Sequence, residues 1–116
     1  MQVAAKEAFD LSGEPEHILK LYGIDRPESA DYGRRCLIAR RLVERGVRYV
    51  QVLNNGQSWD HHSSLISALP KVCAESDRPS AALVADLKQR GLLELLGICF
   101  FGRVFGRVTR NGWRAD

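Results

Sequence analysis

The residues best suited to chemistry form one short cluster, Trp59–His62. Two of the three histidines in the chain, His61 and His62, directly follow Asp60. Carboxylate oxygen and imidazole nitrogen are the donors that zinc and other divalent metals use. Because neighbouring side chains diverge in an extended loop, Asp60 and His62 are expected to share a side as the ligand pair, whereas His61 packs or faces solvent.

Two ligands do not complete a site, since zinc takes at least three protein donors. The alternative is structural: Asp60 would cap the helix that follows it. Nucleophilic catalysis has less support, because the serines near the histidines lack a Gly-x-Ser-x-Gly elbow and no triad order is present. The glycines show no phosphate-binding or dinucleotide fingerprint. No catalytic residue is therefore assigned.

The cluster follows an apolar run, Val47–Leu53, whose β-branched and aromatic residues predict a strand. In open α/β folds, ligand groups gather in loops beyond the carboxyl ends of strands. Before this run, helices are predicted from Glu14 to Tyr22 and from Ser29 to Arg45, ended by Gly23 and Gly46. The arginines of the second helix are expected to cover apolar surface with their stems while their charges stay in water.

After the cluster, a helix is predicted from Ser63 to Glu75, which Pro70 should bend or divide. A further helix is expected to restart at Asp77–Pro79, to turn Asp86 toward solvent and to end at Gly91. A last apolar run, 92–101, should contain a strand. This order of helices and strands is typical of a parallel α/β unit.

The composition bounds the broad class of protein. The chain has 116 residues, 45% of them hydrophobic, and a formal charge of +3. The charge is mildly basic, but Lys and Arg are spread along the chain, so nucleic-acid binding is not favoured. Cys36, Cys73 and Cys99 have no Cys-x-x-Cys spacing, which argues against a disulfide framework or a cysteine-based zinc site. No run is long enough for a membrane span and no signal sequence is evident, so the chain as written is expected in the cytoplasm.

Several motifs together resemble one known family. Leu37–Val52, Trp59–His62, Asp77–Leu83 and Asp86–Leu93 are similar, in order and spacing, to motifs of the bacterial domain-of-unknown-function family 1501. These proteins are sulfatase-like and are placed in the alkaline phosphatase superfamily. The similarity runs almost without a gap to about residue 93, and residues 94–116 form a divergent tail.

The resemblance implies a fold and an activity. The fold would be α/β, a partial doubly wound alkaline-phosphatase-like sheet with flanking helices. Superfamily members bind one or two divalent cations and cleave phosphate or sulfate esters, so the chain resembles a metal-dependent hydrolase of unassigned substrate. The family's Trp-Asp-x-His motif matches Trp59, Asp60 and His62, which makes Asp60 and His62 the implied ligands of zinc, calcium or manganese.

The tail departs from the family pattern. Phe105–Arg107 survives, but Val104 stands where the family has a glutamate that is an expected metal ligand. Family members are also several times longer and carry an export signal. The expectation is therefore that residues 1–116 form one fragment, inactive alone, whose partners are the rest of the hydrolase domain or a second copy. The alternatives are a non-catalytic interaction module or a decayed gene product and, last, a small basic nucleic-acid binder.

Overall fold

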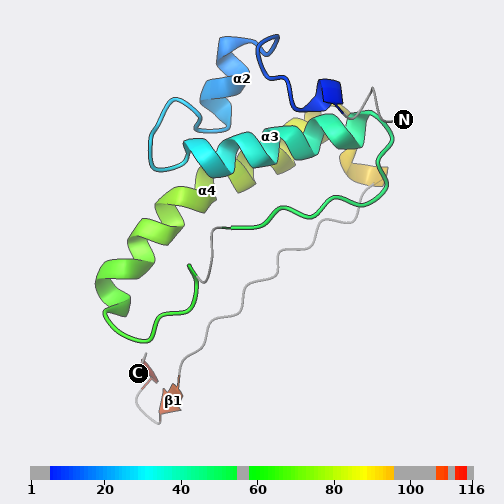
Figure 1. The fold of residues 1–116 in the computed structure, drawn as a ribbon. Coiled ribbons are helices and arrows are strands. Elements are labelled where there is room, and N and C mark those ends of the chain that lie inside the picture. Colours follow the sequence, from blue (N-terminus) through cyan, green and yellow to red (C-terminus); the bar gives the residue numbers. More distant parts are fainter. Residues whose placement is uncertain (1–5, 55–57, 96–106, 110–111, 115–116) are drawn as a thin grey trace.

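The computed structural model describes residues 6–54, 58–95, 107–109 and 112–114, and these residues are mainly helical (Figure 1). A short helical turn at residues 6–8 precedes the main elements. In chain order the elements are α2 (Glu16–Leu21), α3 (Ala30–Glu44), α4 (Leu65–Gln89), the 3-10 turn η1 (Leu93–Leu95), β1 (Arg107–Thr109) and β2 (Gly112–Arg114).

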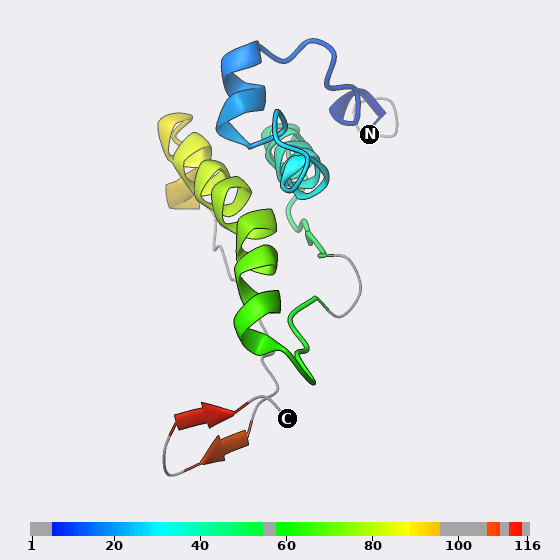
Figure 2. The same cartoon turned by 90° about the vertical axis from the view of Figure 1, so that its left-hand side faces the viewer.

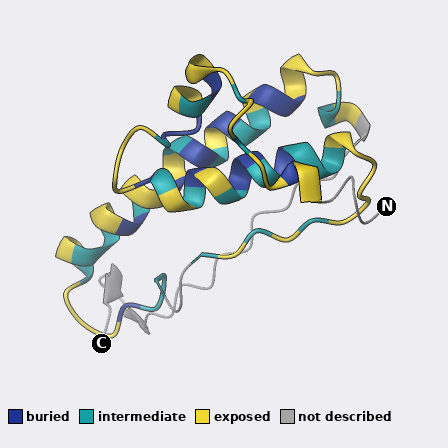
Figure 3. Ribbon diagram, turned by 45° about the horizontal axis from the view of Figure 1, so that its top comes forward, coloured by how far each residue is buried: buried dark blue, intermediate teal, exposed yellow. Residues whose placement is uncertain are grey.

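The core lies where α3 and α4 pack side by side and the short helix α2 covers them (Figures 1 and 2). The buried residues of α3 and α4 lie on the sides where the two helices face each other, and the outer sides of both helices are exposed (Figure 3). The fully and nearly fully buried members of the core are Ile18, Tyr22, Cys36, Leu37 and Ala82. Burial raises the pKa of the Cys36 thiol to about 12, in keeping with a cysteine that serves packing.

One glycine sets how closely the end of α2 approaches α3. Gly33 is buried in the first turn of α3, and a Cβ built on it would clash with the backbone carbonyl oxygen of Tyr22. Only a residue without a side chain fits this contact. Gly33 therefore allows the Tyr22 ring to enter the core beside α3.

The predicted ends of the first two helices are confirmed. Gly23 and Gly46, with φ of +71° and +85°, follow α2 and α3 in the left-handed conformation that terminates helices. The prediction that residues 63–91 form two helices, separated near Asp77, is wrong. α4 is one continuous helix that contains both Pro70 and Pro79.

The continuity of α4 has a physical explanation in its buried face. Val72, Pro79, Ala82 and Leu87 are buried, and such packing contributes more to a helix than local propensity does. Pro70 lacks the N–H that would pair with the carbonyl of Ile66. Ile66 is 93% exposed, so water can satisfy that carbonyl.

The expected α/β fold is contradicted. The described residues contain no parallel sheet and no doubly wound layer, only the antiparallel hairpin of β1 and β2, in which Val108 lies opposite Trp113. Val47–Leu53 runs as an extended segment but forms no strand, and the ladder found among the described residues pairs β1 with β2 only. In the predicted strand at 92–101, residues 93–95 form η1, and 96–101 lie outside the described residues.

Candidate functional site

The predicted cluster lies in a loop that joins the extended segment to α4. Residues 58–64 turn and bend before Leu65 begins the helix. Ser64, the residue before α4, has φ of +57°, a conformation that side chains other than glycine rarely adopt. Its carbonyl accepts hydrogen bonds from the backbone N–H groups of Ser67 and Ala68. The start of α4 thus fixes the end of this loop.

Asp60 and His62 contact each other. His62 Nε2 lies 2.9 Å from Asp60 Oδ2, and the His62 side chain is 81% exposed whereas that of Asp60 is 18% exposed. A neutral imidazole that donates from Nε2 keeps a lone pair on Nδ1. The two residues that the sequence placed on one side therefore do lie together. Asp60 does not cap α4, because the N-cap residue is Ser64, and no side-chain hydrogen bond caps the start of this helix.

His61 points away from solvent, unlike His62. Its side chain is buried, with 6% of the residue exposed. Two atoms of this loop are buried without a hydrogen-bond partner among the described residues, Asp60 Oδ1 and His61 Nε2. A buried polar atom left unpaired costs about 1–3 kcal/mol, so such atoms are rare and call for an explanation.

The loop does not by itself form a complete metal site. Across the described ranges, no three His, Cys, Asp or Glu side chains gather closely enough to hold a metal ion. Val104 and the tail residues 96–106 lie outside the described residues. Asp60 and one histidine amount to two donors, fewer than the three that a zinc site needs from protein.

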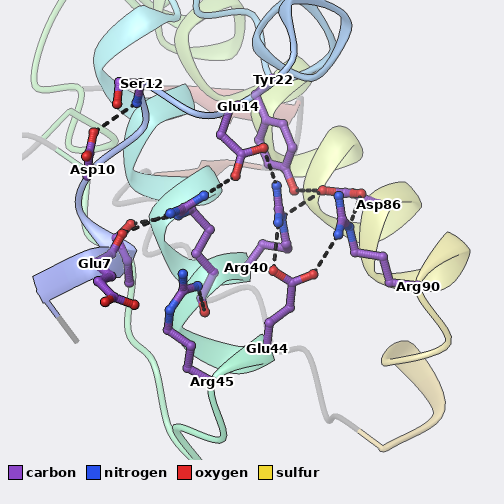
Figure 4. Close-up of polar contacts among 12 residues, drawn as sticks. Glu7, Asp10, Ser12, Glu14, Tyr22, Arg40, Glu44, Arg45, Asp86 and Arg90 are labelled. Carbon is purple, nitrogen blue, oxygen red and sulfur yellow. Dashed lines mark hydrogen bonds and ion pairs between the residues drawn. The ribbon is translucent and has the colours of Figure 1, made fainter. Parts of the chain in front are cut away.

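A second polar cluster, which the sequence did not predict, ties the helices together (Figure 4). Arg40 of α3 is 3% exposed. Its Nη2 donates to Glu14 Oε2 at 2.9 Å and its Nη1 to Glu44 Oε2 at 2.7 Å. Its Nε lies 3.1 Å from Asp86 Oδ2, an ion pair that is not aligned as a hydrogen bond. The guanidinium thus faces three carboxylates from three parts of the chain.

Asp86 of α4 is the second buried member of this network. Its Oδ2 accepts a hydrogen bond of 2.7 Å from the Tyr22 hydroxyl, and its Oδ1 accepts one of 2.8 Å from Arg90 Nε. Arg90 also donates to Glu44 Oε1, and Arg41 pairs with Glu14 Oε1. The network therefore holds the carboxylates Glu14, Glu44 and Asp86 and the guanidiniums of Arg40, Arg41 and Arg90, whose formal charges cancel.

The network shifts the pKa values of its buried members. Burial alone would raise the pKa of Asp86, but hydrogen bonds from Arg90 and Tyr22 and the charge of Arg40 outweigh burial and lower it. The pKa of Glu14 is lowered against the same effect of burial by its hydrogen bond from Arg41 and by Arg40. Burial and the neighbouring Asp86 raise the pKa of Tyr22. The carboxylates thus stay ionised and paired.

This network corrects two expectations from the sequence. Asp86 was expected to face solvent but is 1% exposed, and Arg40 was expected to keep its charge in water but is buried with it. Helical periodicity places polar residues outward by default, and it cannot register a partner such as Tyr22, which lies 64 residues before Asp86. With every cation paired to a carboxylate, the network is suited to holding helices together rather than to binding an anion.

Two surface hollows lie elsewhere on the described surface. One, of about 370 Å³, runs between the extended segment and α3 and is mainly apolar, lined in part by Phe9, Ile38, Leu42 and Val52. The other, of about 230 Å³, is lined by Glu28, Asp31 and Glu75 among others. Neither hollow is lined by residues of the 58–64 loop.

Comparison with known proteins identifies the family but no activity. No helix within the described ranges has the length and apolar character needed to cross a membrane. No curated protein and no solved structure matches the chain. The family described as "Protein of unknown function (DUF1501)" matches residues 1–113. The chain therefore belongs to the DUF1501 family.

Proposed function

We propose that this chain contributes Asp60 and His62 to the metal site of a hydrolase that cleaves phosphate or sulfate esters. The observation that carries the proposal is the contact between His62 Nε2 and Asp60 Oδ2 within the Trp-Asp-x-His motif of a DUF1501 chain. Membership of the family supports the resemblance from which the hydrolase chemistry is drawn. The substrate within this class is left open.

The Asp60–His62 contact supports the proposal because it places the two proposed ligands beside each other. His62 Nε2 and Asp60 Oδ2 lie 2.9 Å apart, so a cation that replaced the proton between them would be bound by both atoms. In the tautomer that carries its proton on Nδ1, the lone pair of Nε2 faces this position. Because the His62 side chain is exposed, the position is open to a cation and to a substrate.

The second carboxylate oxygen fits a cation as well. Asp60 Oδ1 is buried and has no hydrogen-bond partner from the described residues, so a cation would replace the hydrogen bond that it lacks. A bound divalent metal would polarise the ester oxygens and offset charge in the transition state. The chain's own residues would orient the metal, but with two donors we expect the chain to be inactive alone.

Calorimetric titration with zinc, manganese and calcium tests this proposal. The wild-type chain is expected to bind one of the three ions, and the double variant Asp60→Ala/His62→Ala is expected to lose that binding. His17→Ala is the matched control, because His17 is exposed on α2 and far in sequence from the loop. No binding by the wild type, or equal binding by the double variant, would contradict the proposed site.

A second candidate, a non-catalytic module that associates with itself, is favoured by one surface. The extended segment Val47–Leu53 presents Tyr49 and Leu53, which are 79% and 62% exposed, beside the apolar hollow on α3. Exposed extended segments and apolar patches recruit partners. Size-exclusion chromatography with light scattering tests this candidate: a monomer at high concentration counts against it, and a dimer lost in Tyr49→Ser/Leu53→Ser supports it.

A further inference from the structure

The extended segment Val47–Leu53 has the side-chain pattern of a strand, although it belongs to no ladder. From Tyr49 onward, exposed residues alternate with partly buried ones, and Val50 and Val52 are partly buried. These two valines line the apolar hollow that the segment forms with α3. Alternation with a period of two is the geometry of a strand that packs on one face. The segment therefore packs one face on α3 and presents the other to solvent.

The backbone of this segment has hydrogen-bonding groups to offer. The Val47 N–H donates to the Leu42 carbonyl, and the Leu53 carbonyl accepts from Arg35 Nη1. Between these two bonds, the backbone groups of Arg48–Val52 form no hydrogen bond with the described residues. A row of such groups is a template on which a further strand can pair.

The two ends of the segment carry opposite charges. Arg45 and Arg48 are exposed at its beginning, which we call the basic end, and neither forms an ion pair with a described residue. At the other end, Asn54 lines the smaller hollow together with Glu28 and Glu75. These two glutamates, which we call the acidic end, are exposed and are not paired with a described cation. Charge thus changes sign along the segment, which runs beside α3 (Figure 1).

We propose that a second copy of this chain pairs with Val47–Leu53 as an antiparallel strand about a two-fold axis. The pairing rests on the self-association candidate given above and specifies its geometry. In an antiparallel two-fold pair, the beginning of each segment lies beside the end of the other. The basic end of each copy therefore faces the acidic end of its partner. The Asp31–Arg35 ion pair also lines the acidic hollow, and its charges cancel.

The charge distribution favours a second copy over other strands. A strand that is acidic throughout would be repelled by the acidic end, and a basic strand would be repelled by the basic end. A parallel pair of copies would place like charges together. Complementary charges steer association and suppress wrong partners, so the antiparallel pair of copies is the arrangement that satisfies both ends at once.

Two double variants test the pairing, with the molar mass in solution measured by size-exclusion chromatography with light scattering over a range of concentrations. Arg45→Glu/Arg48→Glu makes both ends acidic, and Glu28→Arg/Glu75→Arg makes both ends basic. The wild-type chain is expected to form a dimer. Each double variant alone should dimerise at least about tenfold more weakly, because like charges then face each other. An equimolar mixture of the two should form a dimer again, because one copy then supplies two acidic ends and the other two basic ends.

The matched control is Lys20→Glu/Lys88→Glu, which makes the same change of charge at exposed lysines that line neither hollow. The control should dimerise like the wild type. Circular dichroism checks that the variants fold, and if a double variant does not, Arg48→Glu and Glu75→Arg replace the two in the same experiment. A wild-type dimer that both variants retain, or that their mixture does not restore, would overturn the antiparallel pairing and leave self-association intact. A monomeric wild-type chain would overturn both.

Discussion

The helical network around Arg40 and the loop at 58–64 contain similar residue types, but they differ in how many of their carboxylate oxygens have a partner. In the network, both carboxylate oxygens of Glu14, Glu44 and Asp86 have a cationic or hydroxyl partner. In the loop, one oxygen of Asp60 is paired and the other is not. A closed set of partners indicates a structural role, whereas an open buried acceptor indicates a ligand. The sequence singled out the loop and missed the network, although the network holds more charged groups.

The largest effect on stability is expected at the centre of the network. Arg40→Ala leaves carboxylates from three segments without their shared cation, so the free energy of unfolding should fall by about 3–5 kcal/mol. Urea unfolding followed by circular dichroism measures it. Arg34→Ala, on the exposed face of the same helix, is the control and should change stability by less than about 0.5 kcal/mol. Equal effects would show that the network is not what stabilises the helices.

A smaller loss is expected where α2 approaches α3. Gly33→Ala places a methyl group against the carbonyl oxygen of Tyr22, which belongs to backbone and cannot swing aside. Overpacking of this kind costs about 1–3 kcal/mol. Gly13→Ala is the matched control, because nothing lies within 4 Å of the position that its Cβ would take. Thermal unfolding of the two variants should give a lower midpoint for Gly33→Ala than for Gly13→Ala. Equal midpoints would contradict the close contact.

The network should also make stability depend on acid. The pKa values of Glu14 and Asp86 are lowered in the folded chain from ordinary values of 4.5 and 3.8. Their contribution is therefore complete above those ordinary values and is lost as pH falls through the lower folded values. Urea midpoints should stay level from neutral pH to about 5 and then fall below about 4. In Arg40→Ala the fall should be shallower. An unchanged slope would show that Arg40 does not lower the pKa values of these carboxylates.

The smallest effect on stability is expected in the loop. His62→Ala removes an exposed partner of Asp60, and such pairs contribute at most about 1 kcal/mol. Chemical unfolding should therefore barely distinguish the variant from the wild type, even where the metal titrations do. A loss as large as that of Arg40→Ala would place His62 among the structural residues and remove the contrast between the two regions.

Local features of the sequence predicted where α2 and α3 end better than they predicted the tertiary partners of the helices. Gly23 and Gly46 mark helix ends through backbone conformation, which is a local property. Asp86 was misplaced because its partner Tyr22 is distant in sequence. The β-branched run Val47–Leu53 predicted a strand, but a strand also needs a partner strand, and no described strand pairs with this segment. Sheet formation is the less local property, so the fold class was wrong.

Only the local part of the candidate site was predicted from the sequence. Spacing placed Asp60 and His62 on one side, and the two side chains do contact each other. The burial of His61 and the unpaired Oδ1 of Asp60 depend on the tertiary surroundings of the loop, which spacing does not contain. The residue pattern alone does not show that His61 is buried and His62 is exposed.

The most direct test of the central claim, that the Asp60 loop binds a cation, is thermal unfolding without a metal and with zinc, manganese or calcium. A ligand that binds only the folded chain stabilises it, by about 2.7 kcal/mol at a hundredfold excess over its Kd. At least one of the three ions is expected to raise the unfolding midpoint of the wild-type chain and of Arg34→Ala, but not that of Asp60→Asn. An equal rise in Asp60→Asn, or no rise in the wild type with any of the three ions, would contradict the claim.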